Sequence, residues 1–306
     1  MGDTAEEAGN GRGGWMATLR RWSRSGLTRS PSPPSIGLAL GGGFARGIAH
    51  VGVLRVLERA QIPIHFLSGV SAGSMVAAAY ASGATTEEIH RVGASMRFAD
   101  VARWSLSRLG LAGSERMEQF LQRLLKQHRF EDMRIPLAVV ATDLGTGAPV
   151  IFRGPGEVAL AIRASCSYPG LFQPIRHEGR LLVDGAMSME IPAAPLRRMG
   201  ARRVISVNLP MQGLALPPNN VFQVVNRCFQ IMQARTEDSW RRQSDLVISP
   251  DVCGVEWDSF RSAEKLIEAG EKAATEALPA IRAWLQPDSS RAPLLKPEPS
   301  FDQLSP

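Results

Sequence analysis

Cysteine, lysine and long apolar runs are scarce in this sequence of 306 residues. Its three cysteines, Cys166, Cys228 and Cys253, are odd in number and lie outside any metal-ligand spacing, so neither a disulfide framework nor a zinc site is expected. We expect reduced, partly buried thiols, which fits a cytoplasmic protein. No stretch approaches the roughly 18 uninterrupted apolar residues of a membrane-spanning helix. Apolar residues nevertheless make up 44% of the chain, which is ample for the core of a folded domain.

Only four of the 35 basic residues are lysines, so the formal charge of +6 comes almost wholly from arginine. A basic surface attracts anionic lipid headgroups or nucleic acid. Nucleic acid is not expected as a partner, because the sequence has no zinc-finger pattern and no RNA-binding aromatic signature. An anionic lipid surface is the favoured partner, beside the plainer alternative that the arginines are merely solvated.

Both ends of the chain differ in composition from its middle. Residues 1–34 are rich in Gly, Ser, Arg and Pro, and residues 288–306 are rich in Pro. Such segments bury too little apolar surface to fold, so we expect two disordered tails around one domain over residues 35–287.

One segment of the first tail has helical periodicity. Four apolar residues recur among arginines at a spacing typical of a helix, namely Trp15, Met16, Leu19 and Trp22. A short helix lying on the cytoplasmic face of an anionic membrane is one interpretation, and an unstructured tail is the other. A signal peptide is not expected because its apolar core is missing, and Asp3, Glu6 and Glu7 argue against a transit peptide.

Strand-like and helix-like patterns alternate between the tails. Short apolar runs typical of buried strands cover residues 36–40, 135–141, 180–183, 203–208 and 246–249. Helical patterns cover residues 85–96, 157–165, 219–242 and 262–286. Strands that alternate with helices predict an α/β fold, in which helices sandwich a mainly parallel central sheet in three layers.

A glycine-rich loop, residues 41–47, joins the first strand to a helix and has the sequence Gly-Gly-Gly-Phe-Ala-Arg-Gly. Strand, loop and helix direct several backbone N–H groups at one point, which makes a site for an anion. A dinucleotide fingerprint requires Gly where Arg46 stands and an acidic residue after the next strand, and both are missing. We therefore interpret the loop as an oxyanion hole.

The next strand runs directly into a nucleophile-elbow motif. Gly69-Val70-Ser71-Ala72-Gly73 matches GxSxG between strand-like and helix-forming residues. At such a turn the serine backbone is strained and its Oγ stands clear of the sheet. Ser71 is therefore the candidate nucleophile, although the motif also arises by chance in loops rich in Gly and Ser.

A serine hydroxyl needs a base, and the sequence offers two. Asp143 and His177 complete the order Ser, Asp, His of an α/β-hydrolase. His177, however, lies in a polar stretch with turn character, and an Asp before a glycine-rich turn is more often a turn-capping acceptor. Asp184 follows a strand and has no histidine after it, so it would act on Ser71 directly, as a carboxylate in a dry site can.

Three motifs in this order, residues 41–47, 69–73 and 184–186, resemble those of the patatin-like phospholipases. The resemblance extends over residues 36–286 and implies the patatin-like fold and a hydrolase of phospholipid or lysophospholipid esters that uses neither metal nor cofactor. It also implies a dyad in which Ser71 is the nucleophile and Asp184 is the general base and acid. The implied oxyanion donors are the N–H groups of Gly42, Gly43 and Ala72. The residues that complete the motifs are Gly41, Arg46, Gly47, Gly69, Gly73, Gly185 and Ala186.

Two departures separate the chain from that family pattern. Residues 184–186 have the sequence Asp-Gly-Ala, so Ala186 stands in place of the second glycine of the usual Asp-Gly-Gly. Met189-Glu190 precedes Pro192 where many relatives have asparagines that would brace the loop of the aspartate. Two alternatives therefore stand beside hydrolysis. One is a lipid-binding or regulatory module with little turnover, and the other is a transacylase, in which a lipid alcohol replaces water.

Overall fold

The computed structural model describes residues 33–210, 217–255 and 262–286, apart from the side chains of Leu106 and Phe222. The two expected tails lie outside these ranges except for Pro33 and Pro34, and so does the periodic segment 15–22. The elements from β1 to α9 lie within one compact unit, Pro34–Gln286. None of the helices in the described ranges is long and apolar enough to cross a membrane.

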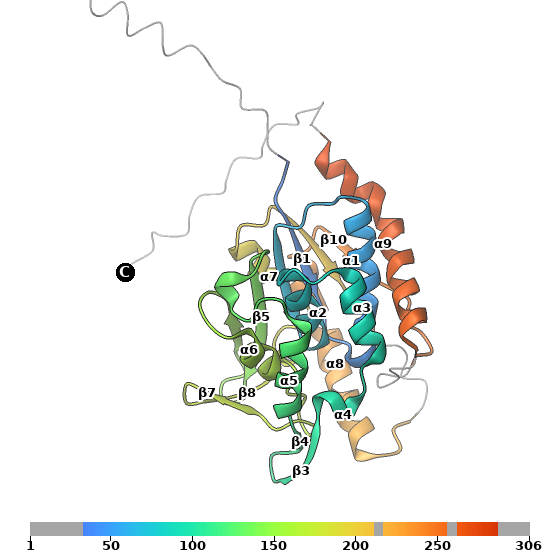
Figure 1. The fold of residues 1–306 in the computed structure, drawn as a ribbon. Coiled ribbons are helices and arrows are strands. Elements are labelled where there is room, and N and C mark those ends of the chain that lie inside the picture. The colour runs from blue at the N-terminus through green and yellow to red at the C-terminus, as the bar shows by residue number, and fades with distance from the viewer. Residues whose placement is uncertain (1–32, 211–216, 256–261, 287–306) are drawn as a thin grey trace, which may run out of the picture. The chain divides into compact units, whose positions relative to one another are not determined.

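Strands and helices alternate along the unit (Figure 1). The strands are β1 (Ile36–Leu40), β2 (Phe66–Val70), β3 (Arg103–Ser107), β4 (Gly110–Gly113), β5 (Leu137–Asp143), β6 (Pro149–Phe152), β7 (Ile175–His177), β8 (Arg180–Asp184), β9 (Arg203–Val207) and β10 (Leu246–Ile248). The helices are α1 (Ala49–Arg59), α2 (Ala72–Ala81), α3 (Thr86–Ser95), α4 (Phe98–Val101), α5 (Glu115–Leu124), α6 (Val158–Ser165), α7 (Ala193–Arg198), α8 (Val221–Arg241) and α9 (Ala263–Leu285). Short 3₁₀ turns are η1 (Phe44–Ile48), η2 (Phe130–Asp132) and η3 (Gly185–Met187).

The central sheet has the strand order β10-β9-β1-β2-β5-β8-β7, with β6 beside β5. β10, β9, β1, β2 and β5 run parallel, and β6, β7 and β8 pair antiparallel, so the prediction of a mainly parallel sheet is confirmed. Val70 lies opposite Val140, so the next position places Ser71 level with Ala141, and Asp184 lies opposite Ala141 from the other side. Strands β2 and β8 thereby deliver Ser71 and Asp184 to the same level of the sheet on either side of β5.

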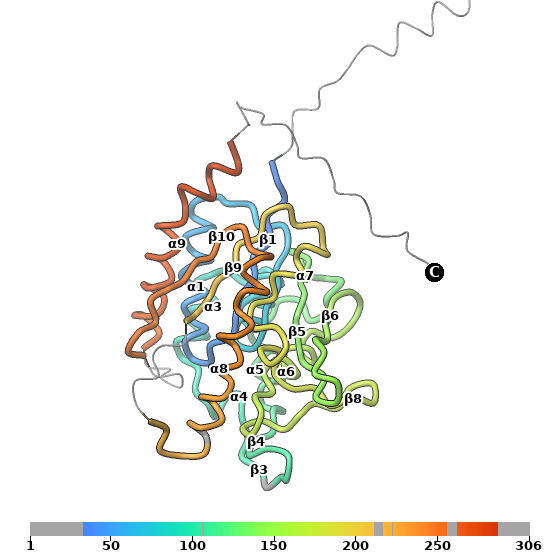
Figure 2. The backbone as a smooth tube through the Cα atoms, turned by 180° about the vertical axis from the view of Figure 1, so that it is seen from behind, coloured from blue at the N-terminus to red at the C-terminus, as the bar shows by residue number. Residues whose placement is uncertain are grey.

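Alternate side chains of β1 pack on opposite faces of the sheet. Leu38 and Leu40 join the large core that contains residues of α1, α2 and α9, whereas Ala39 packs with Leu196 of α7 and Trp240 of α8. Figures 1 and 2, which are opposite views, show α1 beside α9 in both. The expected three layers, with helices on both faces, are therefore present.

Two segments differ from what their sequences predict. The stretch from residue 98 to 112 has no clear period, yet it forms α4 and the β3–β4 hairpin. His177, expected in a turn, ends strand β7, and the turn itself is Glu178-Gly179, with φ of +49° and +76°. Strands this short contain only a few residues of alternating apolar and polar character, so their sequences give little periodic signal.

Candidate active site

Ser71 and Asp184 meet in a buried hydrogen bond. The Ser71 hydroxyl donates to Oδ2 of Asp184 at 2.7 Å, and the two residues are 7% and 2% exposed. Ser71 comes directly after β2 and Asp184 ends β8, so the hydrogen bond crosses the end of β5. A hydroxyl held against a carboxylate in a dry setting is the arrangement that direct proton transfer from nucleophile to base requires.

The backbone around Ser71 has the strained geometry of a nucleophile elbow. Ser71 has φ of +50°, a left-handed value that a residue with a side chain adopts only at a cost. The flanking glycines let the chain approach itself closely at this turn. A Cβ on Gly69 would overlap Ser74, and a Cβ on Gly73 would overlap the carbonyl oxygens of Leu40 and Gly41. The predicted turn between strand and helix is therefore present, and both glycines are required by close packing.

Ser165, the last residue of α6, supports the elbow in a role that we did not predict from the sequence. Its hydroxyl accepts a hydrogen bond from the Ser71 N–H at 2.8 Å and donates one to the Val140 carbonyl at 2.6 Å. The backbone of the nucleophile is thus tied to β5 through one fully buried side chain. A serine at the end of an apolar helix gives no sequence signal of such a role, which depends on a partner far away in the chain.

Asp184 is held in position by groups of its own loop and of β5. Its Oδ1 accepts the Ala186 N–H at 2.9 Å, and its carbonyl oxygen accepts the Thr142 hydroxyl at 2.9 Å. Gly185 leaves no room for a side chain, because a Cβ there would overlap the Val140 carbonyl oxygen. Burial raises the pKa of Asp184 to about 6, against the smaller opposing effect of its hydrogen bonds from Ala186 and Ser71.

The raised pKa predicts how activity depends on pH. Asp184 accepts a proton only when ionised, so kcat/KM for a water-soluble p-nitrophenyl ester should rise as pH increases through about 6 and then level off. The measurement is a rate profile between about pH 4 and 9. His177→Ala is the control, because it should leave the profile unchanged if no histidine titrates in the reaction. Activity that persists undiminished to pH 4.5 would contradict a buried carboxylate base.

The glycine loop lies against the nucleophile. A Cβ on Gly42 would lie 3.4 Å from the Cβ of Ser71, and a Cβ on Gly47 would lie 2.6 Å from the Cβ of Ala72. Within the described ranges, neither Gly42 nor Gly43 donates its N–H to another group. Ala72 begins α2, so its N–H has no acceptor within the helix. Three N–H groups are thus available near Ser71 for a developing negative charge.

His50 braces this loop from α1, a role that its sequence position did not reveal. The side chain is fully buried, and its Nε2 lies 2.9 Å from the carbonyl oxygen of Gly41. Burial lowers the pKa of His50 to about 4, so the neutral ring donates from Nε2 at physiological pH. Gly41 also donates its N–H to Val207 at 3.2 Å, and the start of the loop is therefore fixed on both sides.

The structure does not bring the alternative pair, Asp143 and His177, to the nucleophile. Oδ1 of Asp143 accepts the N–H of Gly145 at 2.9 Å, which is the turn-capping role expected of an Asp before a glycine turn. His177 packs its ring 5.5 Å from the ring of Phe152. Across the described part of the chain, no histidine makes a hydrogen bond to Ser71 or Asp184.

The loop after Asp184 has a brace of a different kind from the expected asparagines. Glu190 accepts a hydrogen bond from Trp240 Nε1 at 3.1 Å, which connects the loop to α8. Met189 donates its N–H to the Gly185 carbonyl at 2.9 Å. Burial raises the pKa of Glu190, against the effect of the Trp240 hydrogen bond. Glu190 therefore gives this loop a polar anchor at the place where the family resemblance led us to expect asparagine.

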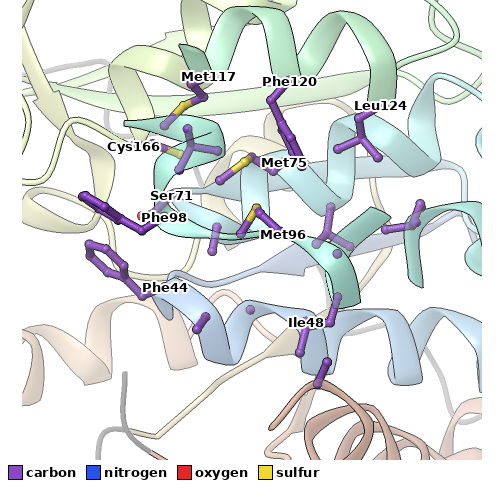
Figure 3. Close-up of a pocket in the computed structure, with 18 of the residues that line it drawn as sticks. Phe44, Ile48, Ser71, Met75, Met96, Phe98, Met117, Phe120, Leu124 and Cys166 are labelled. Atoms are coloured by element: carbon purple, nitrogen blue, oxygen red, sulfur yellow. The ribbon is translucent and has the colours of Figure 1, made fainter. Parts of the chain in front are cut away.

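Ser71 lies where an apolar and a polar cleft meet. The apolar cleft has a volume of about 910 Å³, including space open to solvent, and Figure 3 shows Ser71 near Phe44 and Phe98 at one end of it. Ile48 and Leu124 lie toward the other end, with Met75 and Met96 between. Cys166 also lines this cleft as a buried thiol, whereas Cys228 is exposed, contrary to the expectation for it.

A second cleft meets the first at Ser71, and we call it the polar cleft because more polar side chains line it than line the first. It has a volume of about 620 Å³ and is lined by Arg46, Asp184, Glu190, Asn208, Asn226 and Gln233 among others. Arg46 is 7% exposed, its Nε makes no hydrogen bond, and the described residues give it no ion-pair partner. Burial lowers the pKa of Arg46. The guanidinium nevertheless keeps its charge, because arginine is not deprotonated in proteins. Arg46 therefore has no direct ion-pair partner, although the carboxyl groups of Asp184 and Glu190 line the same cleft.

Known proteins resemble this chain in sequence and in fold. The model of a family described as patatin-like phospholipase matches residues 38–197. An uncharacterized NTE family protein of Mycobacterium tuberculosis is 36% identical over 185 residues, which are 59% of this chain and 51% of that protein. The lysophospholipase NTE1 of Mycosarcoma maydis is 34% identical over 191 residues, 60% of this chain and 10% of that protein.

Among solved structures, VipD from Legionella pneumophila matches with a TM-score of 0.54. The match covers 82% of this chain and 67% of VipD at 14% identity, a likeness that extends to the fold alone. The chain spans about half the length of the mycobacterial relatives it matches.

Proposed function

This chain belongs to the patatin-like phospholipase family, and we propose that it is a serine acyl hydrolase of lipid esters. One observation carries the proposal. The hydroxyl of Ser71 is hydrogen-bonded to buried Asp184 at the junction of an apolar and a polar cleft. An ester with an acyl chain on one side of its carbonyl and a polar group on the other fits this junction.

The proposed reaction uses only groups of this chain and water. Ser71 Oγ attacks the ester carbonyl carbon while its proton passes to Asp184, and the N–H groups of Gly42, Gly43 and Ala72 stabilise the oxyanion. The tetrahedral intermediate then loses the alcohol, which takes the proton back from Asp184. Water attacks the resulting acyl-enzyme, gives a proton to Asp184, and releases the fatty acid as Ser71 regains its hydrogen.

Arg46 supports a substrate that carries a phosphate. A buried guanidinium without a carboxylate partner is costly unless a ligand supplies an anion, and it binds phosphate oxygens through a planar fork of donors. The acyl chain would occupy the apolar cleft while the phosphate lies against Arg46. A lysophospholipid, with one acyl chain and one phosphate, matches the two clefts in number and in chemistry.

Arg46→Gln should therefore discriminate between substrates. Loss of one charged hydrogen-bond pair predicts a decrease of about tenfold to a hundredfold in kcat/KM for lysophosphatidylcholine. Hydrolysis of a monoacylglycerol with the same acyl chain should change far less. The measurement is fatty-acid release from both lipids by wild type, Arg46→Gln and the control Arg59→Gln, whose side chain is exposed on α1. Equal losses on both lipids would contradict a phosphate-binding role.

A further inference from the structure

The β3–β4 hairpin exposes large apolar side chains beside the active-site cleft. Trp104 is 67% exposed, Leu109 54% and Leu111 53%. Exposed apolar residues that are scattered singly need no explanation, but three on one short hairpin form a contact surface. Figures 1 and 2 both show this hairpin at one end of the unit, beyond the central sheet.

Unpaired arginines flank these apolar side chains. Arg103 and Arg108 are exposed, and the structure, over the residues it describes, gives neither an ion-pair partner. The segment of residues 97–116 contains four arginines against two carboxylates, those of Asp100 and Glu115. The surface of an anionic bilayer attracts arginine, while tryptophan settles at the level of the headgroups and leucine enters below them. The composition of the hairpin is therefore complementary to an anionic lipid surface.

Backbone hydrogen bonds fix the hairpin to a wall of the apolar cleft. The N–H groups of Leu111 and Ala112 donate to the Leu171 carbonyl at 3.0 and 2.8 Å, and Gln173 donates its N–H to the Ala112 carbonyl at 2.9 Å. Phe172, between these two partners, lines the cleft that contains Ser71. Whatever surface the hairpin contacts is thereby held in a fixed position relative to the nucleophile.

Aromatic contacts continue from the hairpin into the cleft. The Trp104 ring lies 5.6 Å from the ring of Phe98, which lies 6.0 Å from the ring of Phe172. Phe98 and Phe172 both line the apolar cleft. An acyl chain that leaves a bilayer beside Trp104 meets apolar side chains along this route to Ser71, so little of it is transferred through water.

We propose that the β3–β4 hairpin docks the protein on an anionic bilayer and aligns the mouth of the apolar cleft with the membrane surface. The inference rests on the proposed function in one respect, namely that the bilayer supplies the lipid ester. It assigns membrane contact to a folded element next to the site, in addition to the basic segment 15–22 for which the sequence suggests such contact.

The test measures binding of the full chain to vesicles of phosphatidylcholine and phosphatidylglycerol by co-sedimentation. Leu109→Asp and Arg108→Glu are the informative variants, because neither residue contacts the cleft, whereas Trp104 packs on Phe98. Each should lower the vesicle partition coefficient about tenfold or more. The matched control is Arg59→Glu, an exposed charge reversal at the C-terminal end of α1, which should bind as wild type does. Ser71→Ala, also measured, separates binding from turnover.

Three outcomes decide the proposal. Variants that lose vesicle binding and vesicle-lipid hydrolysis, yet cleave a soluble ester at the wild-type rate, support it. Hairpin variants that bind vesicles as wild type does overturn it. A loss of vesicle binding that is equally large in Arg59→Glu also overturns it. So does a dimer that Leu109→Asp dissociates while vesicle binding stays unchanged. A wild-type protein that binds vesicles through the hairpin but cleaves no ester supports docking and refutes the proposed hydrolase function.

Discussion

Ser71→Ala should lower kcat for a p-nitrophenyl acyl ester by at least about 10⁴-fold, and Asp184→Asn by about 10²–10⁴-fold. The first variant has no nucleophile. The second keeps the hydrogen bond geometry at 2.7 Å but offers no base, because an amide cannot take the proton of the hydroxyl. Steady-state kinetics on one soluble ester, with active-site concentration known, measure both effects.

Stability provides the control for these variants. Burial raises the pKa of Asp184 from its ordinary value of 3.8 to about 6. Between these two pH values the carboxyl group is protonated in the folded protein and ionised in the unfolded chain. Stability is therefore lost as pH rises through this window, and at neutral pH the buried carboxylate is destabilising. Asp184→Asn removes that cost and should raise the melting temperature above pH 7. If Asp184→Asn were inactive and also less stable than wild type, misfolding would explain its loss of activity.

Gly43→Val should lower kcat by about 10²–10³-fold, with a smaller change in KM, by displacing an oxyanion donor. A Cβ on Gly43 would lie 2.8 Å from Cδ1 of buried Leu209, and the added methyl groups of valine extend further. Either the end of the Leu209 side chain or the loop must shift to relieve this contact, and the nearby backbone N of Gly47, 3.4 Å from the added Cβ, leaves the loop little room. A shift of the loop turns its N–H groups away from the carbonyl oxygen. Substrate binding in the apolar cleft involves other residues, so KM is less affected.

Gly145→Val is the matched control for this prediction. Gly145 is an exposed turn glycine whose added Cβ would approach only Asp143 Oδ1, at 3.4 Å. It should retain wild-type kcat. If Gly43→Val retained full turnover while remaining folded, the glycine loop would have no part in stabilising the oxyanion.

The parallel half of the sheet was predictable because its strands are buried on both faces. β1 and the first five residues of β5 appear in the sequence as apolar runs next to glycine or proline, and β9 has Ser206 as its one polar residue after Arg203. The direction of β8 was not predictable, since an apolar run does not reveal which neighbour it pairs with. That antiparallel pairing with β5 is what places Asp184 level with Ser71.

The candidate site was predictable where its chemistry is local and not where it depends on distant contacts. Ser71 and its glycines form a motif of five consecutive residues, and the glycine loop is equally compact. Ser165 acts on a backbone 94 positions away, and Glu190 bonds to Trp240 across 50 positions. The sequence around Ser165 gives no sign of its partner, and Glu190 stands out only as a departure from the family pattern, with no sign that it bonds to Trp240.

The most direct test of the account is to locate the acyl group on the enzyme. A soluble acyl ester is mixed with enzyme, the reaction is quenched in acid during the first turnover, and peptides are analysed by mass spectrometry. We predict that the acyl group is on Ser71 in wild type, that it accumulates at least about a hundredfold more slowly in Asp184→Asn, and that it is absent from Ser71→Ala. An acyl group on another residue, or undiminished acylation in Asp184→Asn, would contradict the Ser71–Asp184 dyad.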